Sequence, residues 1–218
     1  MNDCCAVPGA EGYEEVFDDR FARKSARRYQ RKGLTPTERR IVSFISATGV
    51  DDATVLEVGG GVGEIQLELL ARGAASTVNL ELSGAYEAEA ARLIGEAGVD
   101  GRVTRRLGVD LAVTTEKVDM ADVVVLHRVV CCYPDYERLL GAAADRARHT
   151  IVFSHPPRTL TRRAFVAVGN LALRLSHKTY RGFIHSPSAM IDTLRRHGFE
   201  PRLRHNGRSW CVIGAIRA

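Results

Sequence analysis

The sequence predicts an α/β fold: a mostly parallel β-sheet with an antiparallel last strand and helices on both faces. Three observations support this prediction. Short apolar runs typical of buried strands alternate with amphipathic, helix-like segments from about residue 54 onward. A glycine-rich turn joins the first of these strands directly to a helix. Asn206-Gly207 separates the last two strand-like runs and predicts a hairpin, which makes the final strand antiparallel.

The first part of the chain, residues 1–34, is predicted to be a helical extension or lid. Residues 1–12 show no periodic pattern. Tyr13, Phe17 and Phe21 then recur at every fourth position, which predicts one stripe of a helix. The helical pattern continues through a strongly basic stretch.

The main domain is predicted to span residues 35–218 and to begin with a well-marked helix. Thr35 and Glu38 form a capping box around Pro36, and Gly49 ends the helix. The predicted strands that follow lie at about 54–58, 76–81, 102–107, 121–127, 150–154, 199–205 and 209–217. The predicted helices lie at about 62–72, 84–97 and 135–147, in an insertion at about 158–181, and from Ser186-Pro187 to Gly198.

Length and composition suit one such domain. With 218 residues, of which 45% are hydrophobic, the chain can bury a sizeable core. No apolar run of about 18 residues or more occurs, so no membrane span is expected. The first residues lack the basic-then-apolar pattern of a signal peptide. We therefore expect a cytoplasmic, reducing location with the five cysteines as thiols.

Positive charge is concentrated in one segment. Between Arg20 and Arg40 there are nine basic residues, and Glu38 is the one acidic residue among them. Such a segment can bind nucleic acid, attract an acidic substrate, or simply form the solvated face of a helix. The sequence leaves these three interpretations open.

The glycine-rich turn carries the clearest functional pattern. The run from Thr54 to Val58 contains Glu57, and Gly59, Gly61 and Gly63 follow at every second position. Glycines at such a turn let backbone N–H groups approach a ligand closely. Dinucleotide sites use a different spacing, GxGxxG. A preceding carboxylate suits a ligand with positive charge or ammonium donors, so the pattern predicts a nucleotide-like cofactor of that kind.

In this motif and its strand–turn–helix context the chain resembles the class I methyltransferases that use S-adenosyl-L-methionine (SAM). In element order the resemblance covers about residues 35–218. It implies a Rossmann-like methyltransferase sheet, SAM as the cofactor, and a methyl transfer reaction. It also implies that Glu57, Gly59, Gly61 and Gly63 belong to the cofactor site.

Further cofactor-binding residues are expected where the other parallel strands end. The resemblance implies that Glu81, followed by Leu82, accepts hydrogen bonds from the ribose hydroxyls. It implies that Asp110 accepts one from the adenine amino group and that the Leu111 backbone meets a ring nitrogen. His127 is expected beside the methionine part of SAM, with its backbone closer to the cofactor than its ring.

The catalytic residues are less sharply predicted. Methyl transfer from a sulfonium is an in-line displacement in which the protein mainly positions the acceptor and excludes water, and a general base is optional. The main candidates are His127, Tyr133 and His155. Other side chains expected near strand ends or on lids are Cys131, Cys132, His185 and Tyr29.

The segment from His127 to Asp135 is similar to that of magnesium-protoporphyrin O-methyltransferases, which carry an apolar pair, a His, and then Tyr-Pro. Cys132 stands where those enzymes have the His. The resemblance therefore implies the reaction class and not the substrate.

The predicted insertion has an apolar centre, residues 164–175, with arginines and a lysine around it. This pattern fits a helical lid over an apolar, negatively charged acceptor. It also fits a helix on a membrane surface, or an ordinary packed helix with solvated arginines.

The cysteines do not predict a metal site. Cys4-Cys5 and Cys131-Cys132 are adjacent pairs, and Cys211 stands alone, whereas zinc sites usually have CxxC spacing. Cys131 and Cys132 fit buried packing positions. If the two pairs met, a soft metal or metalloid substrate would be the alternative.

These observations favour a SAM-dependent methyltransferase that acts on a small molecule, most simply at oxygen. One alternative is an RNA methyltransferase that uses the basic N-terminal helix, although no recognisable RNA-binding domain is present and nucleic acid is not the expected partner. Another is a SAM-fold protein that transfers no methyl group. The sequence leaves the acceptor, the atom methylated and the oligomeric state open.

Overall fold

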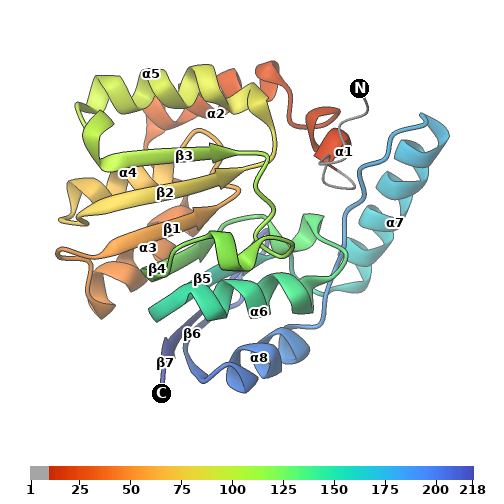
Figure 1. Ribbon diagram of the computed structural model, residues 1–218. Helices are drawn as coiled ribbons and strands as arrows, with labels where there is room; N and C mark the ends of the chain where they lie inside the picture. The colour runs from red at the N-terminus through yellow and green to blue at the C-terminus, as the bar shows by residue number, and fades with distance from the viewer. Residues whose placement is uncertain (1–9) are drawn as a thin grey trace.

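A computed structural model describes residues 10–218, and within them one seven-stranded sheet in the order β3-β2-β1-β4-β5-β7-β6 (Figure 1). The strands are β1 (Thr54–Val58), β2 (Ser76–Glu81), β3 (Val103–Leu107), β4 (Ala121–Leu126), β5 (Ala147–His155), β6 (Phe199–His205) and β7 (Cys211–Arg217). β1 to β5 pair in parallel, and β7 runs antiparallel to both β5 and β6. The predicted fold class is confirmed.

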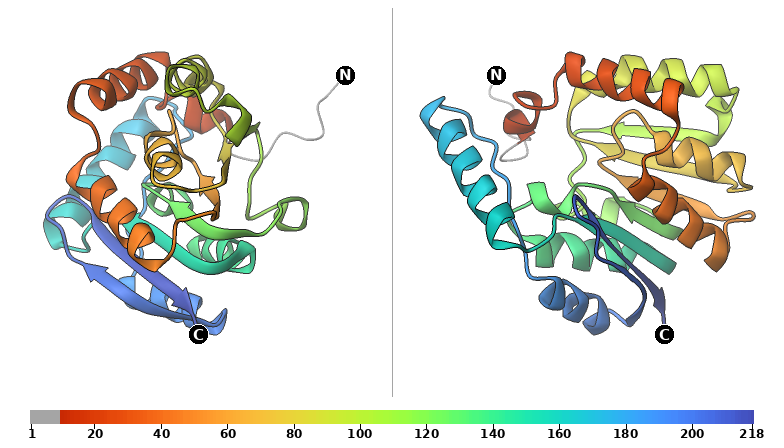
Figure 2. Two further views of the ribbon diagram at one scale, coloured as in Figure 1. Left: turned by 90° about the vertical axis from the view of Figure 1, so that its left-hand side faces the viewer. Right: turned by 180° about the vertical axis from the view of Figure 1, so that it is seen from behind.

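Helices cover both faces of the sheet (Figures 1 and 2). They are α1 (Ala10–Glu14), α2 (Asp19–Lys32), α3 (Pro36–Thr48), α4 (Glu64–Ala71), α5 (Glu87–Ala97), α6 (Tyr136–Arg146), α7 (Leu160–Leu175) and α8 (Pro187–Arg196). Short 3-10 turns lie at η1 (Gly84–Tyr86), η2 (Asp100–Arg102), η3 (Thr115–Lys117) and η4 (Val130–Cys132). Within the described residues, no helix is both long and apolar enough to cross a membrane.

The core has two main layers, one on each face of the sheet. One joins α6 and α8 to the sheet, with Phe153, Phe199 and Leu140 fully buried. The other lies beneath α3 and α4 around Ile41 and Ile45. β1 and β4 are nearly continuous apolar runs because both of their faces are covered. This burial fixes the carboxyl ends of the central strands, where ligands bind in open α/β sheets.

The start of the domain follows the sequence closely. Thr35 caps α3, the Thr35 hydroxyl accepts from the Glu38 N–H, and the Glu38 carboxylate accepts from the Thr35 N–H. The predicted capping box is therefore confirmed. The hairpin around Asn206-Gly207 is confirmed as well, because it joins β6 to β7.

The prediction that Tyr13, Phe17 and Phe21 share one helix is wrong. α1 ends at Glu14, and α2 begins only after Asp18, whose side chain accepts a hydrogen bond from the Phe21 N–H. An aspartate that can cap a new helix start competes with continuation of the old one. The three rings nevertheless cluster. The centroid of the Phe17 ring lies 6.4 Å from that of Tyr13 and 5.5 Å from that of Phe21.

The extension and the insertion are placed differently on the molecule. α2 buries Ala22 and Ala26 against a small cluster that includes Tyr86 and Leu93. α7 stands away from the sheet (Figure 2), and none of its residues is buried.

Candidate functional site

A cavity opens at the carboxyl edge of β1, β2 and β4, beneath α1 and the start of α2. Nine of the residues predicted for the site line it: Glu57, Gly59, Gly61, Glu81, Leu82, Asp110, Leu111, His127 and Tyr133. Gly63 and His155 are not among the lining residues. The topology thus brings together side chains from strand ends that are far apart in the sequence.

The turn after β1 needs its glycines for space as well as for conformation. Gly59 and Gly61 have positive φ angles of 63° and 57°. A Cβ on Gly59 would lie 2.6 Å from Val129 Cγ2, and a Cβ on Gly60 would lie 2.7 Å from Glu57 Cδ and also clash with Asn79. Gly63 has a φ of 87° and caps α4, facing Gln66 and not the cavity.

Glu57 is a buried carboxyl with a free oxygen. It is 2% exposed, and its Oε2 has no hydrogen-bond partner among the described residues. Burial, with a smaller contribution from Glu64, raises the pKa of Glu57 well above its usual range, although Arg105 opposes the shift. An unpaired buried acceptor that lines a cavity fits a ligand with ammonium donors, because such a ligand supplies the missing partner.

Glu81 ties the glycine turn to the end of β2. Its Oε2 accepts a hydrogen bond of 2.9 Å from the Gly61 N–H. Its Oε1 accepts from the N–H groups of Leu82 and Ser83 at 2.8 and 3.1 Å. Burial raises the pKa of Glu81, and these N–H groups counteract part of that rise by stabilising the charged form. The carboxylate is held in one orientation at the cavity wall.

Asp110 is held in a similar way after β3. One carboxylate oxygen accepts from the Ala112 N–H at 2.9 Å, and the other accepts from the Tyr133 hydroxyl at 2.9 Å. Burial and the Asp110 charge raise the pKa of Tyr133. Tyr133 therefore stays protonated near neutral pH and acts as a donor that orients Asp110.

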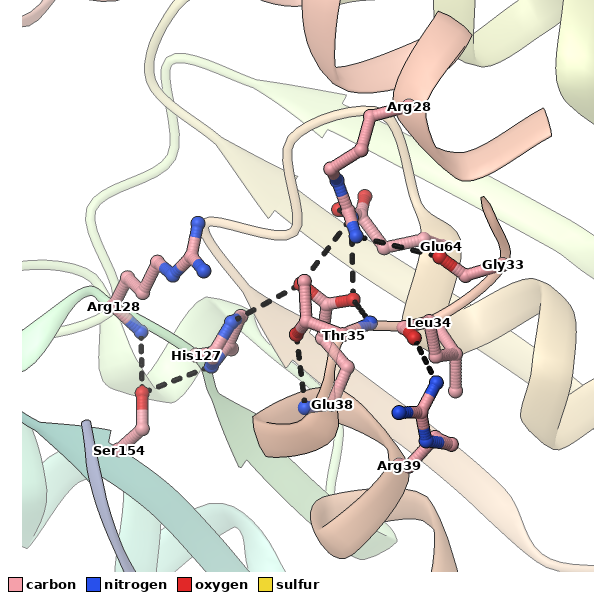
Figure 3. A network of polar contacts seen from close by, with 10 residues as sticks. All are labelled: Arg28, Gly33, Leu34, Thr35, Glu38, Arg39, Glu64, His127, Arg128 and Ser154. Atoms are coloured by element: carbon pink, nitrogen blue, oxygen red, sulfur yellow. Dashed lines mark hydrogen bonds and ion pairs between the residues drawn. The ribbon is translucent and has the colours of Figure 1, made fainter. Parts of the chain in front are cut away.

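His127 belongs to a polar network between β4, β5 and α3 (Figure 3). Its Nδ1 is 2.9 Å from Ser154 Oγ, and the Arg128 N–H donates a hydrogen bond of 2.9 Å to the same oxygen. Its Nε2 lies 3.5 Å from Glu38 Oε1. Burial lowers the pKa of His127 although Glu38 opposes the shift, so the ring is neutral near pH 7.

Glu38 extends this network to α2 and α4. Arg28 lies 3.2 Å from Glu38 and 3.0 Å from Glu64 (Figure 3). Burial raises the pKa of Glu38, but the contacts with His127, the Thr35 N–H and Arg28 outweigh it and lower the pKa to about 2. A charged carboxylate thus joins the extension to the base of the site.

The outer wall of the cavity is aromatic. Tyr13, Phe17 and Phe21 line it, and the Tyr13 hydroxyl donates to the Cys132 carbonyl at 2.9 Å. Tyr180, from the segment after α7, has its hydroxyl 3.0 Å from Cys132 Sγ. Two segments distant in sequence therefore meet at η4, on the rim of the cavity.

Of the remaining candidates, Cys132 lines the cavity at its rim, and the others lie outside its lining. His155 is 4% exposed, with Nδ1 2.9 Å from the Pro156 carbonyl, and burial lowers its pKa. His185 contacts the Tyr133 carbonyl at 3.0 Å, and the Tyr29 hydroxyl contacts Glu68 at 3.3 Å. Cys131 and Cys132 are half-buried with sulfur atoms 3.7 Å apart. Cys4 and Cys5 lie outside the described residues.

Solved structures of other proteins share this architecture. Magnesium protoporphyrin IX methyltransferase from Synechocystis PCC 6803, solved with bound SAH, superposes with a TM-score of 0.69 at 20% identity over 99% of this chain and 97% of that one. The chain has a methyltransferase fold. No protein-family model matches the sequence, and neither does any curated protein.

Two other proteins with a methyltransferase fold are similar. An O-methyltransferase family protein from Burkholderia thailandensis has a TM-score of 0.69 at 20% identity, over 92% of this chain and 59% of that one. An O-methyltransferase family 2 protein from Planctomyces limnophilus DSM 3776, in complex with apigenin, has a TM-score of 0.66 at 15% identity over 92% and 62%. At these identities the likeness is one of fold.

Within this methyltransferase fold, sequence reasoning missed three features of the site. Gly60, like Gly59, has no room for a Cβ, and the uninterrupted run of three glycines was the signal in the sequence. Arg128 lines the cavity with a φ of 62°, unusual for a residue other than glycine. The contact between Glu38 and His127 had no signal in the sequence, because it depends on how α3 packs against β4.

Proposed function

We propose that the protein is a SAM-dependent methyltransferase that transfers a methyl group to an oxygen of a small-molecule acceptor. The observation that carries this proposal is the convergence of the glycine turn with the carboxyl groups of Glu57, Glu81 and Asp110 on one cavity. The methyltransferase fold supports it, since the Synechocystis protein with that fold was solved with bound SAH.

The residues that line the cavity fit SAM. Glu57 would accept from its ammonium group, and Glu81 with Leu82 would bind the ribose hydroxyls. Asp110 and the Leu111 backbone would hold the adenine, and the His127 backbone would lie beside the methionine part. When bound, SAM supplies an electrophilic methyl group on a sulfonium. The glycine turn, from Gly59 to Gly63, supplies close backbone approach.

The chain's own contribution to the chemistry is to position the acceptor and exclude water. We assign the lid role to residues 1–34, because Tyr13, Phe17 and Phe21 form the outer wall of the cavity. An apolar acceptor would pack against these rings. The Arg128 guanidinium, which makes no ion pair within the described part of the chain, favours an acceptor that also carries negative charge.

An acidic acceptor needs little proton transfer. A carboxylate that is already ionised at neutral pH can attack without a general base. His127, neutral and held by Ser154, is then proposed as a positioning residue, and Tyr133 orients Asp110. His155 stays a catalytic candidate that would have to act from outside the cavity wall. We also propose a cytoplasmic, reducing location, which the free thiols of Cys131 and Cys132 support.

Calorimetric titration with SAM and with S-adenosylhomocysteine tests the proposal. We expect micromolar binding of both, tighter for S-adenosylhomocysteine. Glu81→Gln should weaken SAM binding by about 1–3 kcal/mol, because charge-assisted hydrogen bonds are lost. Glu116→Gln, which changes an exposed carboxyl that does not line the cavity, is the matched control. No binding of either compound to the parent protein would refute the cofactor assignment.

One observation favours the RNA alternative. Seven basic residues of α2 surround a surface hollow: Arg20, Arg23, Lys24, Arg27, Arg28, Arg31 and Lys32. RNA binding that weakens steeply with salt, together with methylation of RNA, would favour this substrate class. SAM binding without methyl transfer to any acceptor would instead indicate a SAM-fold protein that is not a methyltransferase.

A further inference from the structure

α7 exposes an unusual amount of apolar surface. Five large apolar side chains on this helix are between 56% and 80% exposed: Leu160, Phe165, Val168, Leu171 and Leu175. Only four other large apolar residues are strongly exposed in the described part of the chain, and they are scattered over α2, the end of β3 and the loops. A contiguous exposed apolar patch on one element indicates an interaction surface.

The exposed side chains form one face of the helix. Leu160, Val168, Leu171 and Leu175 are spaced by eight, three and four residues, which returns to the same side of a helix. The opposite side is half-buried against the segment that follows α7. There the Asn170 side chain forms two hydrogen bonds of 2.8 Å with the Gly182 backbone. The helix is thus anchored on one side and apolar on the other.

The charge around this face has a single sign. Between Asp145 and Asp192 the sequence contains no acidic residue. Arg163 and Arg174, eleven residues apart on α7, are exposed and flank the apolar stripe on one side. Arg158 and Lys178 add positive charge at the two ends of the helix. Within this segment the apolar stripe is edged by cations alone, and it is complementary to a surface that is apolar inside and anionic outside.

We propose that α7 docks in the plane of an anionic lipid bilayer, with its apolar face at the acyl boundary and its arginines among the lipid headgroups. With 16 residues, at about 1.5 Å per residue, α7 is too short to span a bilayer but suits an interfacial helix. A second copy of the chain fits less well, because pairing two such faces would bring like charges together.

Docking there would bring the cavity close to the membrane. After α7 the chain returns to the cavity rim, where the Lys178 ammonium donates to the Glu15 carbonyl at 3.0 Å and the Thr179 N–H donates to the Glu15 carboxylate at 3.1 Å. Figures 1 and 2 show α7 standing beside α1 at this end of the molecule. An apolar acceptor dissolved in the bilayer would then reach the site without crossing water.

Co-sedimentation with vesicles tests this inference, independently of SAM binding or turnover. The probe vesicles are phosphatidylcholine alone and phosphatidylcholine with phosphatidylglycerol. We expect binding to the anionic vesicles and much weaker binding to the neutral ones. Leu171→Ser combined with Leu175→Ser should weaken binding by at least about tenfold. Arg163→Gln and Arg174→Gln should each weaken it by about fivefold at low salt.

Two controls keep the test specific to α7. Leu107→Ser removes an exposed apolar residue at the end of β3, and Arg23→Gln with Arg31→Gln removes charge from α2. Both should bind vesicles like the parent protein. The α7 side chains are exposed, so the variants should keep the parent melting temperature, which calorimetry checks.

Equal sedimentation with neutral and anionic vesicles, or none with either, would overturn the proposal. So would loss of binding only in the α2 variant, or a solution dimer that the α7 substitutions dissociate.

Discussion

At the scale of residues, the site depends on carboxyl groups that the fold keeps from solvent. Glu57 keeps an oxygen that is unpaired within residues 10–218, while Glu81 is fixed by three backbone N–H groups. A preorganised acceptor binds a ligand hydroxyl or ammonium group without the cost of ordering it first. Backbone N–H groups already hold the Glu81 carboxylate in place, whereas one Glu57 oxygen lacks such a partner among the described residues. Substitutions at the two residues should therefore have different effects on folding and on binding.

Gly60→Ala tests how closely the turn is packed. The new methyl group would clash with Asn79 and approach Glu57 Cδ to 2.7 Å, so the turn must shift. We expect a loss of about 1–3 kcal/mol in the free energy of unfolding and at least a tenfold loss in SAM affinity. Denaturant unfolding and calorimetric titration measure the two effects. Gly101→Ala, with open space around its Cβ, is the control; parent-like behaviour of Gly60→Ala would contradict the packing argument.

The Glu38 network predicts a dependence of stability on pH. The folded-state pKa of Glu38, about 2, lies below its ordinary value of 4.5. The stabilisation is therefore complete above about pH 4.5 and is lost as the pH falls toward 2. It amounts to on the order of 3 kcal/mol. Glu38→Gln should flatten the acid side of the stability curve, measured by urea unfolding at several pH values.

Because other buried groups also titrate in acid, the test compares the slope of stability against pH between variants. Glu116→Gln changes the same charge on the surface and should keep the slope of the parent protein. If Glu38→Gln shows that slope too, the network does not hold the Glu38 carboxylate in its charged form.

At the scale of elements, the closure of the site depends on η4. The Tyr13 hydroxyl from the N-terminal extension and the Tyr180 hydroxyl from the segment after α7 both contact Cys132 there. Neither contact belongs to a strand or helix pairing, so each can break without disturbing the sheet. We infer that these contacts decide how tightly the aromatic wall is closed.

Tyr13→Phe tests this closure, because it removes one hydrogen bond and keeps the ring. The loss of about 1 kcal/mol should weaken SAM binding by about fivefold, with the change mainly in the dissociation rate. Stopped-flow displacement measures that rate. Tyr136→Phe is the matched control, since its hydroxyl has no hydrogen-bond partner among residues 10–218. An unchanged dissociation rate in Tyr13→Phe would mean that the extension does not restrain the cofactor.

Elements with local signals, and the strand ends that meet at the cavity, could be predicted from the sequence, whereas individual side-chain contacts between elements could not. The capping box at Thr35 and the turn at Asn206-Gly207 depend on neighbouring residues, and both appear in the structure. The contact between His127 and Glu38 joins residues far apart in the chain, so no spacing could reveal it. The prediction of one helix through Tyr13, Phe17 and Phe21 was wrong for the opposite reason, because a local helix cap at Asp18 outweighed the periodic pattern.

At the scale of the whole molecule, the site joins the N-terminal extension and the segment after α7 to the central strands. A ligand that binds only the folded state stabilises it by mass action, by about 2.7 kcal/mol at a hundred times its Kd. For a domain of this size that corresponds to an increase of roughly 5–10 °C in Tm. S-adenosylhomocysteine should produce this shift in a thermal melt, and Glu81→Gln should reduce it. A melt that S-adenosylhomocysteine leaves unchanged would contradict the assignment of the cavity.

The position of β7 has a consequence for the order of assembly during synthesis. β7 follows β6 in the chain but lies between β6 and β5 in the sheet. Until β7 is made, β6 has no strand to pair with among the described residues, and the apolar edge of β5, with Val152 and Phe153, stays open. An unprotected edge of this kind invites aggregation. The nascent chain is therefore prone to aggregate until the β6–β7 hairpin docks as a unit on β5.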